Sequence, residues 1–274
     1  MIKQKNNELQ YKLYKEEYDN VYFDIMEKGY DSSGHYSALV EEEIKKITGR
    51  KFVYLTSSGT AAITAGIYAL DLFGKTVALS SYNFSACVNQ YQVFCKTRFS
   101  DCDDQTLIDI DKIDNTCDAL MLVNYWGNIV DYDKVNEKFK GKIIADCSQS
   151  FGGKYKGRND GYFGHISTFA FGGQKAIGTR GNTGAVATDD ENIAHRLNCA
   201  INQGRLNEDK SIPVEMVGFN GKPQELQAGL IFVNLQHREE WQKKRVAMAN
   251  KMISELSTLD KIRIIQPGDY CEAN

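Results

Sequence analysis

The sequence predicts an α/β protein with a mainly parallel sheet that helices cover on both faces. From Phe52 onward, short apolar runs alternate with helical patterns, which is typical of parallel strands joined by helical crossovers. Runs such as KIIAD (142–146) are apolar at successive positions, as strands buried on both faces require. The predicted strands span residues 52–55, 77–79, 97–100, 119–123, 142–145, 166–171 and 185–188.

Helical patterns account for most of the remaining chain. Residues 8–27 are rich in Tyr, Lys and Glu and predict a partly exposed helical lead-in, followed by a loop at 29–35. The later predicted helices span residues 36–48, 61–70, 86–94, 132–139, 193–202, 225–235 and 238–256, and a last strand spans 262–265. We therefore expect a large domain over residues 1–240, with its lead-in at 1–50, and a long helix and the start of a smaller domain at 241–274.

Composition narrows the class of partner. The 274 residues carry a net charge of −3 with both signs mixed, so we expect a small-molecule partner rather than a nucleic acid or a membrane. The first residues are too polar for a signal peptide and no apolar run reaches the ~18 residues of a membrane span, which predicts a cytoplasmic protein. The seven cysteines are scattered and indicate reduced thiols, and no two of the four histidines lie within helical spacing, so no metal site is expected.

One lysine and one aspartate stand out. Lys175 lies among aromatic residues and glycines in FAFGGQKAIG (169–178), which predicts partial desolvation. Desolvation lowers the pKa of an amine and leaves it able to attack a carbonyl, so Lys175 is a Schiff-base candidate. Asp146 ends an apolar strand, and open α/β sheets bind ligands at the carboxyl ends of their strands. Taken alone, Lys175 is better explained as an ordinary surface lysine and Asp146 as an ordinary turn aspartate.

Three further features lie at the ends of predicted strands. The segment TSSGT (56–60) precedes a helix, and N–H groups at a helix start can bind a phosphate, although alone it indicates only a helix N-cap. Phe84 could stack on a flat heterocycle, although such a ring is more often part of the core. Gln149, shortly after Asp146, could bind a ring oxygen or be an ordinary turn residue.

Together these features match the needs of pyridoxal 5'-phosphate (PLP). The phosphate needs an anion site, the ring a stacking partner, the pyridine nitrogen a carboxylate and the aldehyde an amine. The sequence therefore predicts PLP as the cofactor.

Four segments resemble, in order and spacing, the motifs of the DegT/DnrJ/EryC1/StrS sugar aminotransferases: SSGTAA (57–62), IIADCSQSFG (143–152), GHISTFAFGGQK (164–175) and VGFNGKPQELQA (217–228). The resemblance is greatest to the branch that makes 3-amino or 4-amino deoxysugars on nucleotides. It implies the aspartate-aminotransferase fold (PLP fold type I) and a homodimer with shared active sites. A plain loop before a helix is the alternative explanation of the last segment.

The resemblance also implies residue roles. The phosphate would be bound by Ser58, Gly59 and Thr60 of one subunit and by Asn220 of the partner subunit. The ring would be held by Phe84 on one face, Gln149 at the ring hydroxyl, Asp146 at the pyridine nitrogen and Lys175, the catalytic amine bonded to the cofactor.

The sequence departs from the family pattern in several places. Ala170 stands where the family has a serine that helps bind the phosphate, so a charge-assisted hydrogen bond of about 1.5–3 kcal/mol is missing and a lower cofactor affinity is expected. The segment 178–184 differs from the family's glycine-rich segment. The chain is also shorter than family members, so we expect either a fragment or a shortened member with a more open pocket, in which residues 241–274 begin a truncated small domain.

The leading hypothesis is PLP-dependent transfer of an amino group from an amino acid, expected to be glutamate, to the keto group of a nucleotide-linked (dTDP, UDP or GDP) deoxysugar, in amino-sugar and surface-polysaccharide biosynthesis. The alternative is a non-catalytic cofactor-binding or scaffold homologue, which Ala170 and the segment 178–184 favour. A dehydratase of the same family is disfavoured, because those members resemble this chain but carry histidine where Lys175 stands. A P-loop is excluded by its spacing. Arg180, Arg205 and the loop at 29–36 are candidate substrate contacts, although solvated surface arginines are the simpler explanation.

Overall fold

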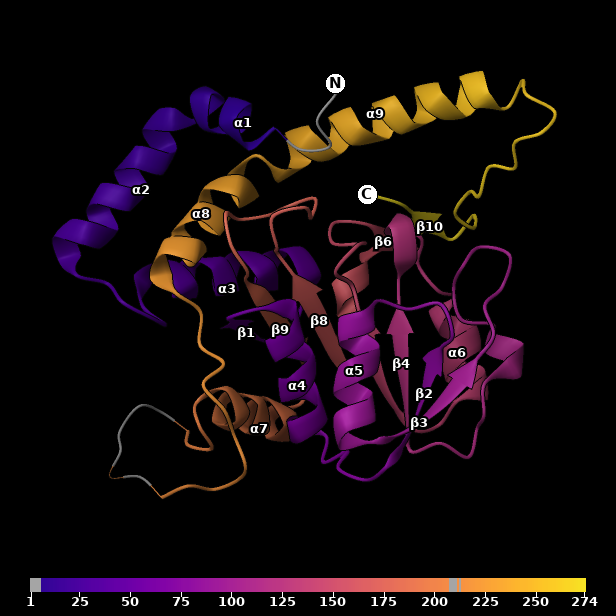
Figure 1. Cartoon of the computed structure of the whole chain (residues 1–274), viewed down its shortest axis with the longest axis horizontal. Helices are drawn as coiled ribbons and strands as arrows, with labels where there is room; N and C mark the ends of the chain where they lie inside the picture. Colours follow the sequence, from indigo (N-terminus) through magenta and orange to yellow (C-terminus); the bar gives the residue numbers. More distant parts are fainter. Residues whose placement is uncertain (1–5, 207–210, 212) are drawn as a thin grey trace.

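The chain forms a seven-stranded sheet and a separate three-stranded sheet (Figure 1). The computed structural model describes residues 6–206, 211 and 213–274. The large sheet has the order β1-β9-β8-β5-β4-β2-β3 and the small sheet the order β10-β6-β7. The strands are β1 (Phe52–Thr56), β2 (Thr76–Ser80), β3 (Lys96–Ser100), β4 (Ala119–Val123), β5 (Lys142–Asp146), β6 (Lys154–Tyr155), β7 (Arg158–Asn159), β8 (Ile166–Ala170), β9 (Gly184–Thr188) and β10 (Cys271–Glu272).

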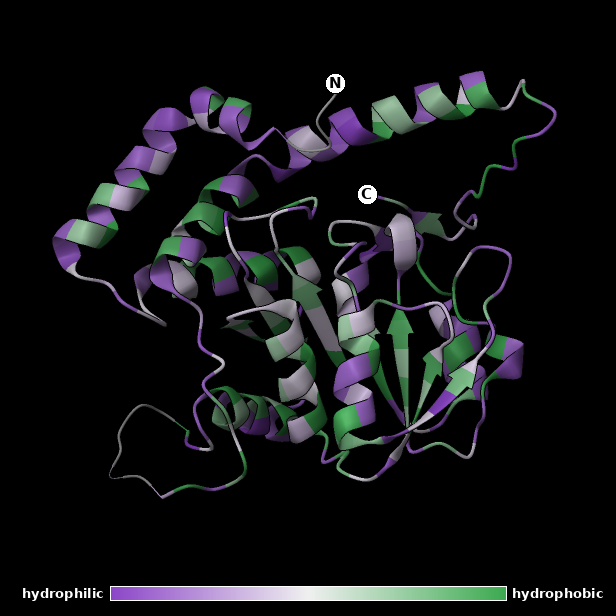
Figure 2. Ribbon diagram, viewed as in Figure 1, coloured by the Kyte–Doolittle hydropathy of each residue, from purple (hydrophilic) through white to green (hydrophobic). Residues whose placement is uncertain are grey.

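The large sheet is mainly parallel and covered on both faces. β9 runs antiparallel to its neighbours β1 and β8, whereas β8, β5, β4, β2 and β3 pair in parallel. All five residues of β4 and of β9 are buried, although successive side chains of a strand point to opposite faces. Figure 2 shows mainly hydrophobic residues along β4. The predicted α/β class is confirmed.

Helices pack around this sheet, and every predicted helix is present with ends within two residues of the prediction. α4 lies against β8 and β9 and contacts α5 and α7, while α8 packs on α2 and α3. In the described part of the chain, none of the helices combines the length and the apolar character needed to cross a membrane. The helices are α1 (Asn7–Leu13), α2 (Lys15–Lys28), α3 (His35–Thr48), α4 (Gly59–Ala69), α5 (Ser85–Phe94), α6 (Tyr132–Lys138), α7 (Glu191–Ile201), α8 (Glu225–Gln236) and α9 (Arg238–Leu256).

The N-terminal lead-in is helical but broken. The backbone of Tyr14, with φ −119° and ψ 28°, separates α1 from α2. α2 buries Tyr18, Val21 and Ile25, whose spacing of three and four residues places them on one face of the helix. This helix ends at Gly29, which takes the left-handed conformation that favours glycine.

The strand predicted at 262–265 is wrong. This segment has irregular backbone, and Ile262 and Ile265 are 45% and 44% exposed. An apolar run becomes a strand only where another strand pairs with it, and here the pairing forms later, between β10 and β6. The Asn274 side chain also donates to the Phe151 carbonyl at 2.6 Å. α9 runs across the domain boundary expected at residue 240, and the division into two domains stays a prediction.

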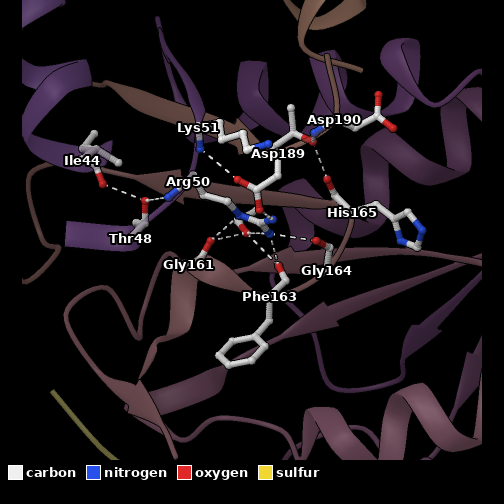
Figure 3. A network of polar contacts seen from close by, with 12 residues as sticks. Ile44, Thr48, Arg50, Lys51, Gly161, Phe163, Gly164, His165, Asp189 and Asp190 are labelled. Atoms are coloured by element: carbon white, nitrogen blue, oxygen red, sulfur yellow. Dashed lines mark hydrogen bonds and ion pairs between the residues drawn. The ribbon is translucent and has the colours of Figure 1, made fainter. Parts of the chain in front are cut away.

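The buried side chain of Arg50, between α3 and β1, joins segments that are far apart in sequence (Figure 3). It donates to the carbonyl oxygens of Gly161 and Gly164 at 2.9 and 2.8 Å and to the Ser167 hydroxyl at 2.9 Å. It also forms an ion pair with Asp189 at 2.9 Å. Because a buried guanidinium is stable only when its donors are satisfied, Arg50 fixes the start of β8 relative to the end of β9.

We expect Arg50→Ala to destabilise the fold by about 3 kcal/mol or more, because buried carbonyl groups and Asp189 lose their partner. Urea unfolding followed by circular dichroism measures the free energy of unfolding. Arg158→Ala is the matched control: Arg158 is exposed and lies 4.7 Å from the ring centroid of Tyr162, so its loss should cost less than about 1 kcal/mol. Equal losses for the two variants would contradict the structural role of Arg50.

Candidate active site

Asp146 lies at the carboxyl end of β5, paired in the strand register with Thr168 of β8. Only 4% of the residue is exposed. The Cys87 thiol of α5 donates to Oδ2 at 3.2 Å, and the Ser148 N–H donates to Oδ1 at 2.9 Å. A carboxylate has about four acceptor positions, so Asp146 can accept further hydrogen bonds from a ligand.

The electrostatics of Cys87 connect Asp146 with Lys175. Burial raises the pKa of the Cys87 thiol well above its ordinary value, and the charge and hydrogen bond of Asp146 raise it further. The positive charge of Lys175 acts on the same thiol in the opposite direction and lowers its pKa. The charges of Lys175 and Asp146 therefore change the pKa of the same buried thiol in opposite directions.

Lys175 lies in the turn that follows β8. Its backbone N–H donates to the Gly172 carbonyl at 2.9 Å, and the residue is half-buried. Among the residues that the structure describes, Nζ has no hydrogen-bond or ion-pair partner. The amine is therefore available to a ligand.

The loop at 56–60 forms a cradle at the start of α4. The Ser58 hydroxyl is the N-cap and accepts from the Ala61 N–H at 3.0 Å. The preceding N–H groups, of Gly59 and Thr60, belong to the first turn and have no partner within the described chain. A Cβ on Gly59 would lie 2.6 Å from the Cβ of Ala170, so β8 approaches the helix start closely. This arrangement can bind a phosphate.

Phe84 begins the helix whose Cys87 bonds to Asp146, and Gln149 follows Asp146 by three residues. Phe84 is the N-cap of α5, three residues before Cys87, and it is 58% exposed, so the core role that its type favours is wrong. Gln149 accepts the Trp126 N–H through Oε1 at 3.1 Å and keeps its amide donors for another partner. The contacts of both residues with a cofactor ring stay predictions.

Asn220 is exposed and lies near the loop at 56–60 of its own chain. The carbonyl of the next residue, Gly221, accepts the Ser57 N–H at 2.8 Å. Asn220 also forms an isolated bridge with Asn202 at the end of α7. The contact with a cofactor in the partner subunit stays a prediction.

Two site residues were missed in the sequence. Cys87 is one of the seven cysteines expected only to be reduced thiols, although its place one turn into the helix after Phe84 directs it inward. Thr168 is 1% exposed, and its hydroxyl has no hydrogen-bond partner among the described residues. The alternation of side chains along a strand indicates Thr168, because it lies two residues before Ala170 and thus on the same face of the sheet.

The expected substrate contacts are largely occupied by protein partners. Arg180 is exposed and donates to the Asn7 carbonyl at 2.6 Å. Arg205 also has a partner. In the loop at 29–36, the N–H groups of Gly34 and Tyr36 donate to the buried carboxylate of Glu225 at 2.8 and 2.7 Å.

A cavity of about 1470 Å³ adjoins the predicted cofactor residues but does not include Asp146 or Lys175 in its lining. Trp126, Ile177, Arg238 and Arg245 are among the residues that line it. Ile177 is two residues from Lys175, and Trp126 is bonded to Gln149. The Nε of Arg245 is buried without a partner among the described residues.

The fold and the residues at the carboxyl ends of β5 and β8 define an α/β protein of the aspartate-aminotransferase type, PLP fold type I. The amine, carboxylate, free N–H groups and exposed ring fit the functional groups of PLP. Residues 13–269 match the DegT/DnrJ/EryC1/StrS aminotransferase family, and the chain belongs to this family.

Individual relatives agree with this membership. The chain is 28% identical over 241 residues to GDP-perosamine synthase of Escherichia coli O157:H7, covering 84% of this chain and 66% of that protein. It is 28% identical over 263 residues to 3-oxo-glucose-6-phosphate:glutamate aminotransferase of Bacillus subtilis (strain 168), covering 92% and 59%. Its structure is similar to that of NtdA from Bacillus subtilis with bound cofactor PMP, with a TM-score of 0.86, 26% identity and coverage of 97% and 62%. The chain thus spans less than two thirds of these proteins.

We expect Gly59→Ala to destabilise the fold by about 1–3 kcal/mol, because its Cβ would lie 2.6 Å from that of Ala170 and force the start of α4 away from β8. Gly66→Ala, in the same helix, is the control: its Cβ would make ordinary contacts at 3.7 Å, and alanine favours a helix interior by about 0.5–1 kcal/mol. Thermal unfolding of both variants measures the difference. A Gly59→Ala variant as stable as Gly66→Ala would disprove the close approach.

Proposed function

We propose that this chain binds PLP and transfers an amino group from an amino acid to the keto group of a nucleotide-linked deoxysugar. The observation that carries the proposal is geometric: Asp146 ends β5, and Lys175 follows β8, the strand that pairs with β5 in parallel, so the two residues come from carboxyl ends at the same edge of the sheet. Family membership supports the reaction class, and the NtdA structure supports the cofactor.

Each residue would have a distinct task. When bound, PLP supplies an electron sink for the negative charge that develops next to the transferred nitrogen. Asp146 would hold a proton on the pyridine nitrogen through a charge-assisted hydrogen bond, strengthened by its burial. Lys175 Nζ would take a proton from the donor's α-carbon, as a general base, and return one to the sugar carbon, as a general acid. The N–H groups of Gly59 and Thr60 would hold the phosphate.

The relatives support the substrate classes. GDP-perosamine synthase is named for a nucleotide sugar, and the Bacillus relative is named for a sugar phosphate and glutamate. We therefore propose a nucleotide-linked keto sugar as acceptor and glutamate as donor, in amino-sugar and surface-polysaccharide biosynthesis. Arg238 and Arg245 at the large cavity support an anionic acceptor, since guanidinium groups bind diphosphates.

The proposal includes a cytoplasmic homodimer in which Asn220 of the partner subunit completes the phosphate site. The exposure of Asn220 beside the loop at 56–60 supports this assignment. Ser58 would assist as the N-cap, and Phe84 and Gln149 would contact the ring.

A second candidate is a homologue that binds the cofactor without turnover. Ala170 favours it, because the residue next to Gly59 offers no hydroxyl to a phosphate. Amino transfer from glutamate to a panel of keto-sugar nucleotides and keto-sugar phosphates separates the two candidates. Sustained formation of 2-oxoglutarate supports the enzyme, and PLP binding without product supports the binder.

We expect Lys175→Ala to abolish covalent attachment of PLP. Wild-type protein incubated with PLP and reduced with borohydride should gain the cofactor's mass on the peptide that contains Lys175, because an amine and an aldehyde form a reducible bond. Lys156→Ala is the control, since Lys156 is exposed and paired with Asp133 at 2.5 Å. Unmodified Lys175 in the wild type, at saturating PLP, would refute the proposal.

We expect Ala170→Ser to strengthen PLP binding about tenfold or more, because one charge-assisted hydrogen bond contributes about 1.5–3 kcal/mol. Fluorescence titration with PLP measures the dissociation constant. Ala249→Ser, at an exposed position of α9, should leave it unchanged. An unchanged affinity in Ala170→Ser would mean that the phosphate does not lie at the start of α4.

A further inference from the structure

We propose that His195, Cys199 and Glu215 form a binding site for a zinc-type divalent cation, outside the candidate active site. His195 and Cys199 lie one helical turn apart on α7, and Glu215 comes from the segment that follows this helix. Their ligand atoms all lie within 4.8 Å of one another. The spacing of histidines alone does not indicate this site, because its helical pair consists of a histidine and a cysteine.

The backbone holds Glu215 against the end of α7. The Gly204 N–H donates to the Cys199 carbonyl at 2.8 Å, and the Glu215 N–H donates to the Gly204 carbonyl at 2.8 Å. Gly204 has φ +85°, and a Cβ there would lie 2.0 Å from the Met216 carbonyl oxygen, so only glycine allows this connection. Two backbone hydrogen bonds therefore hold Glu215 beside the end of α7.

The distances suit tetrahedral coordination. Zinc bonds of about 2.0–2.1 Å to nitrogen or oxygen and about 2.3 Å to sulfur imply separations of about 3.6 Å between N and S and about 3.3 Å between N and O. Cys199 Sγ lies 3.7 Å from His195 Nε2, and Glu215 Oε2 lies 2.7 Å from the same nitrogen. A shift of the carboxylate by about 0.6 Å brings the separation between N and O to its tetrahedral value. The Glu215 side chain is 42% exposed and can make this shift.

The ligand types select the metal and leave one position open. A thiolate, an imidazole and a carboxylate are a donor set that zinc binds, whereas calcium and magnesium prefer oxygen alone. Cys199 is buried, and the side chains of His195 and Glu215 are exposed by 45% and 42%, so a water molecule can take the fourth position from the solvent side. On binding, the thiol loses its proton to solvent and the sulfur bonds to the metal.

A second histidine–glutamate pair provides the comparison. His237 Nε2 lies 2.8 Å from the Glu17 carboxylate, but the metal-ligating clusters of the described residues do not include this pair, since no thiol joins it. Comparing the two pairs therefore separates the contribution of the thiolate to zinc binding from that of a histidine and its carboxylate alone.

The test is a titration of the full chain, freed of metal with EDTA, with Zn²⁺ in competition with a chromogenic chelator. We expect one zinc ion per chain. Cys199→Ser, His195→Gln and Glu215→Gln should each weaken binding at least about tenfold, because even outer partners of a metal site contribute 10- to 100-fold. His237→Gln should bind zinc like the wild type. Co²⁺ should give a sulfur-to-metal absorption band that is lost in Cys199→Ser.

Several results would overturn the proposal. They are a zinc affinity unchanged in the three ligand variants, a loss in His237→Gln as large as in His195→Gln, or a Co²⁺ spectrum without a thiolate band. Circular dichroism without metal checks that each variant is folded. If Cys199→Ser does not fold, the exposed His195→Gln and Glu215→Gln variants decide, because neither side chain is part of the core. PLP binding does not enter the measurement, so its failure and that of the proposed function are distinguishable.

Discussion

The position of α4 depends on a steric constraint at its first residue. Gly59 lies against Ala170 of β8, and Gly184 of β9 lies against the backbone of Ser58, where a Cβ would approach to 2.5 Å. Only residues without large side chains allow the helix to begin directly over two strand ends. The unpartnered N–H groups of its first turn are thereby brought beside the loop that leads from β8 to Lys175.

The same strand ends determine the electrostatics of the site. Parallel pairing of β5 with β8 sets Asp146 beside Thr168, and α5 closes over them with the Cys87 thiol. A buried carboxylate is stable only when it is hydrogen-bonded, and Asp146 receives one bond from a side chain and one from the backbone. Asp146 can accept further hydrogen bonds, and the amine of Lys175 has no partner among the described residues. The two groups suit a ligand that carries both an acidic hydrogen-bond donor and an electrophile.

Away from this edge, buried polar groups hold the chain connections in place. Arg50 joins the loop before β8 to the end of β9, and Glu225 of α8 accepts N–H groups from the loop before α3. At the end of α7, Gly204 bonds through its backbone to both Cys199 and Glu215 and holds the two residues together. These contacts join residues distant in sequence, so local patterns do not reveal them.

The sequence by itself determined the class of fold, the seven strands of the large sheet and the helices, because hydrophobic periodicity and helix-start residues are local properties. It also determined which residue types follow the strands at 56–60, 146 and 175. Only the tertiary structure decided that Phe84 is exposed, that Cys87 donates to Asp146, that 262–265 is not a strand and that His195, Cys199 and Glu215 meet. Strand pairing and side-chain contact depend on segments far apart in the chain, and no local pattern records which of them become neighbours.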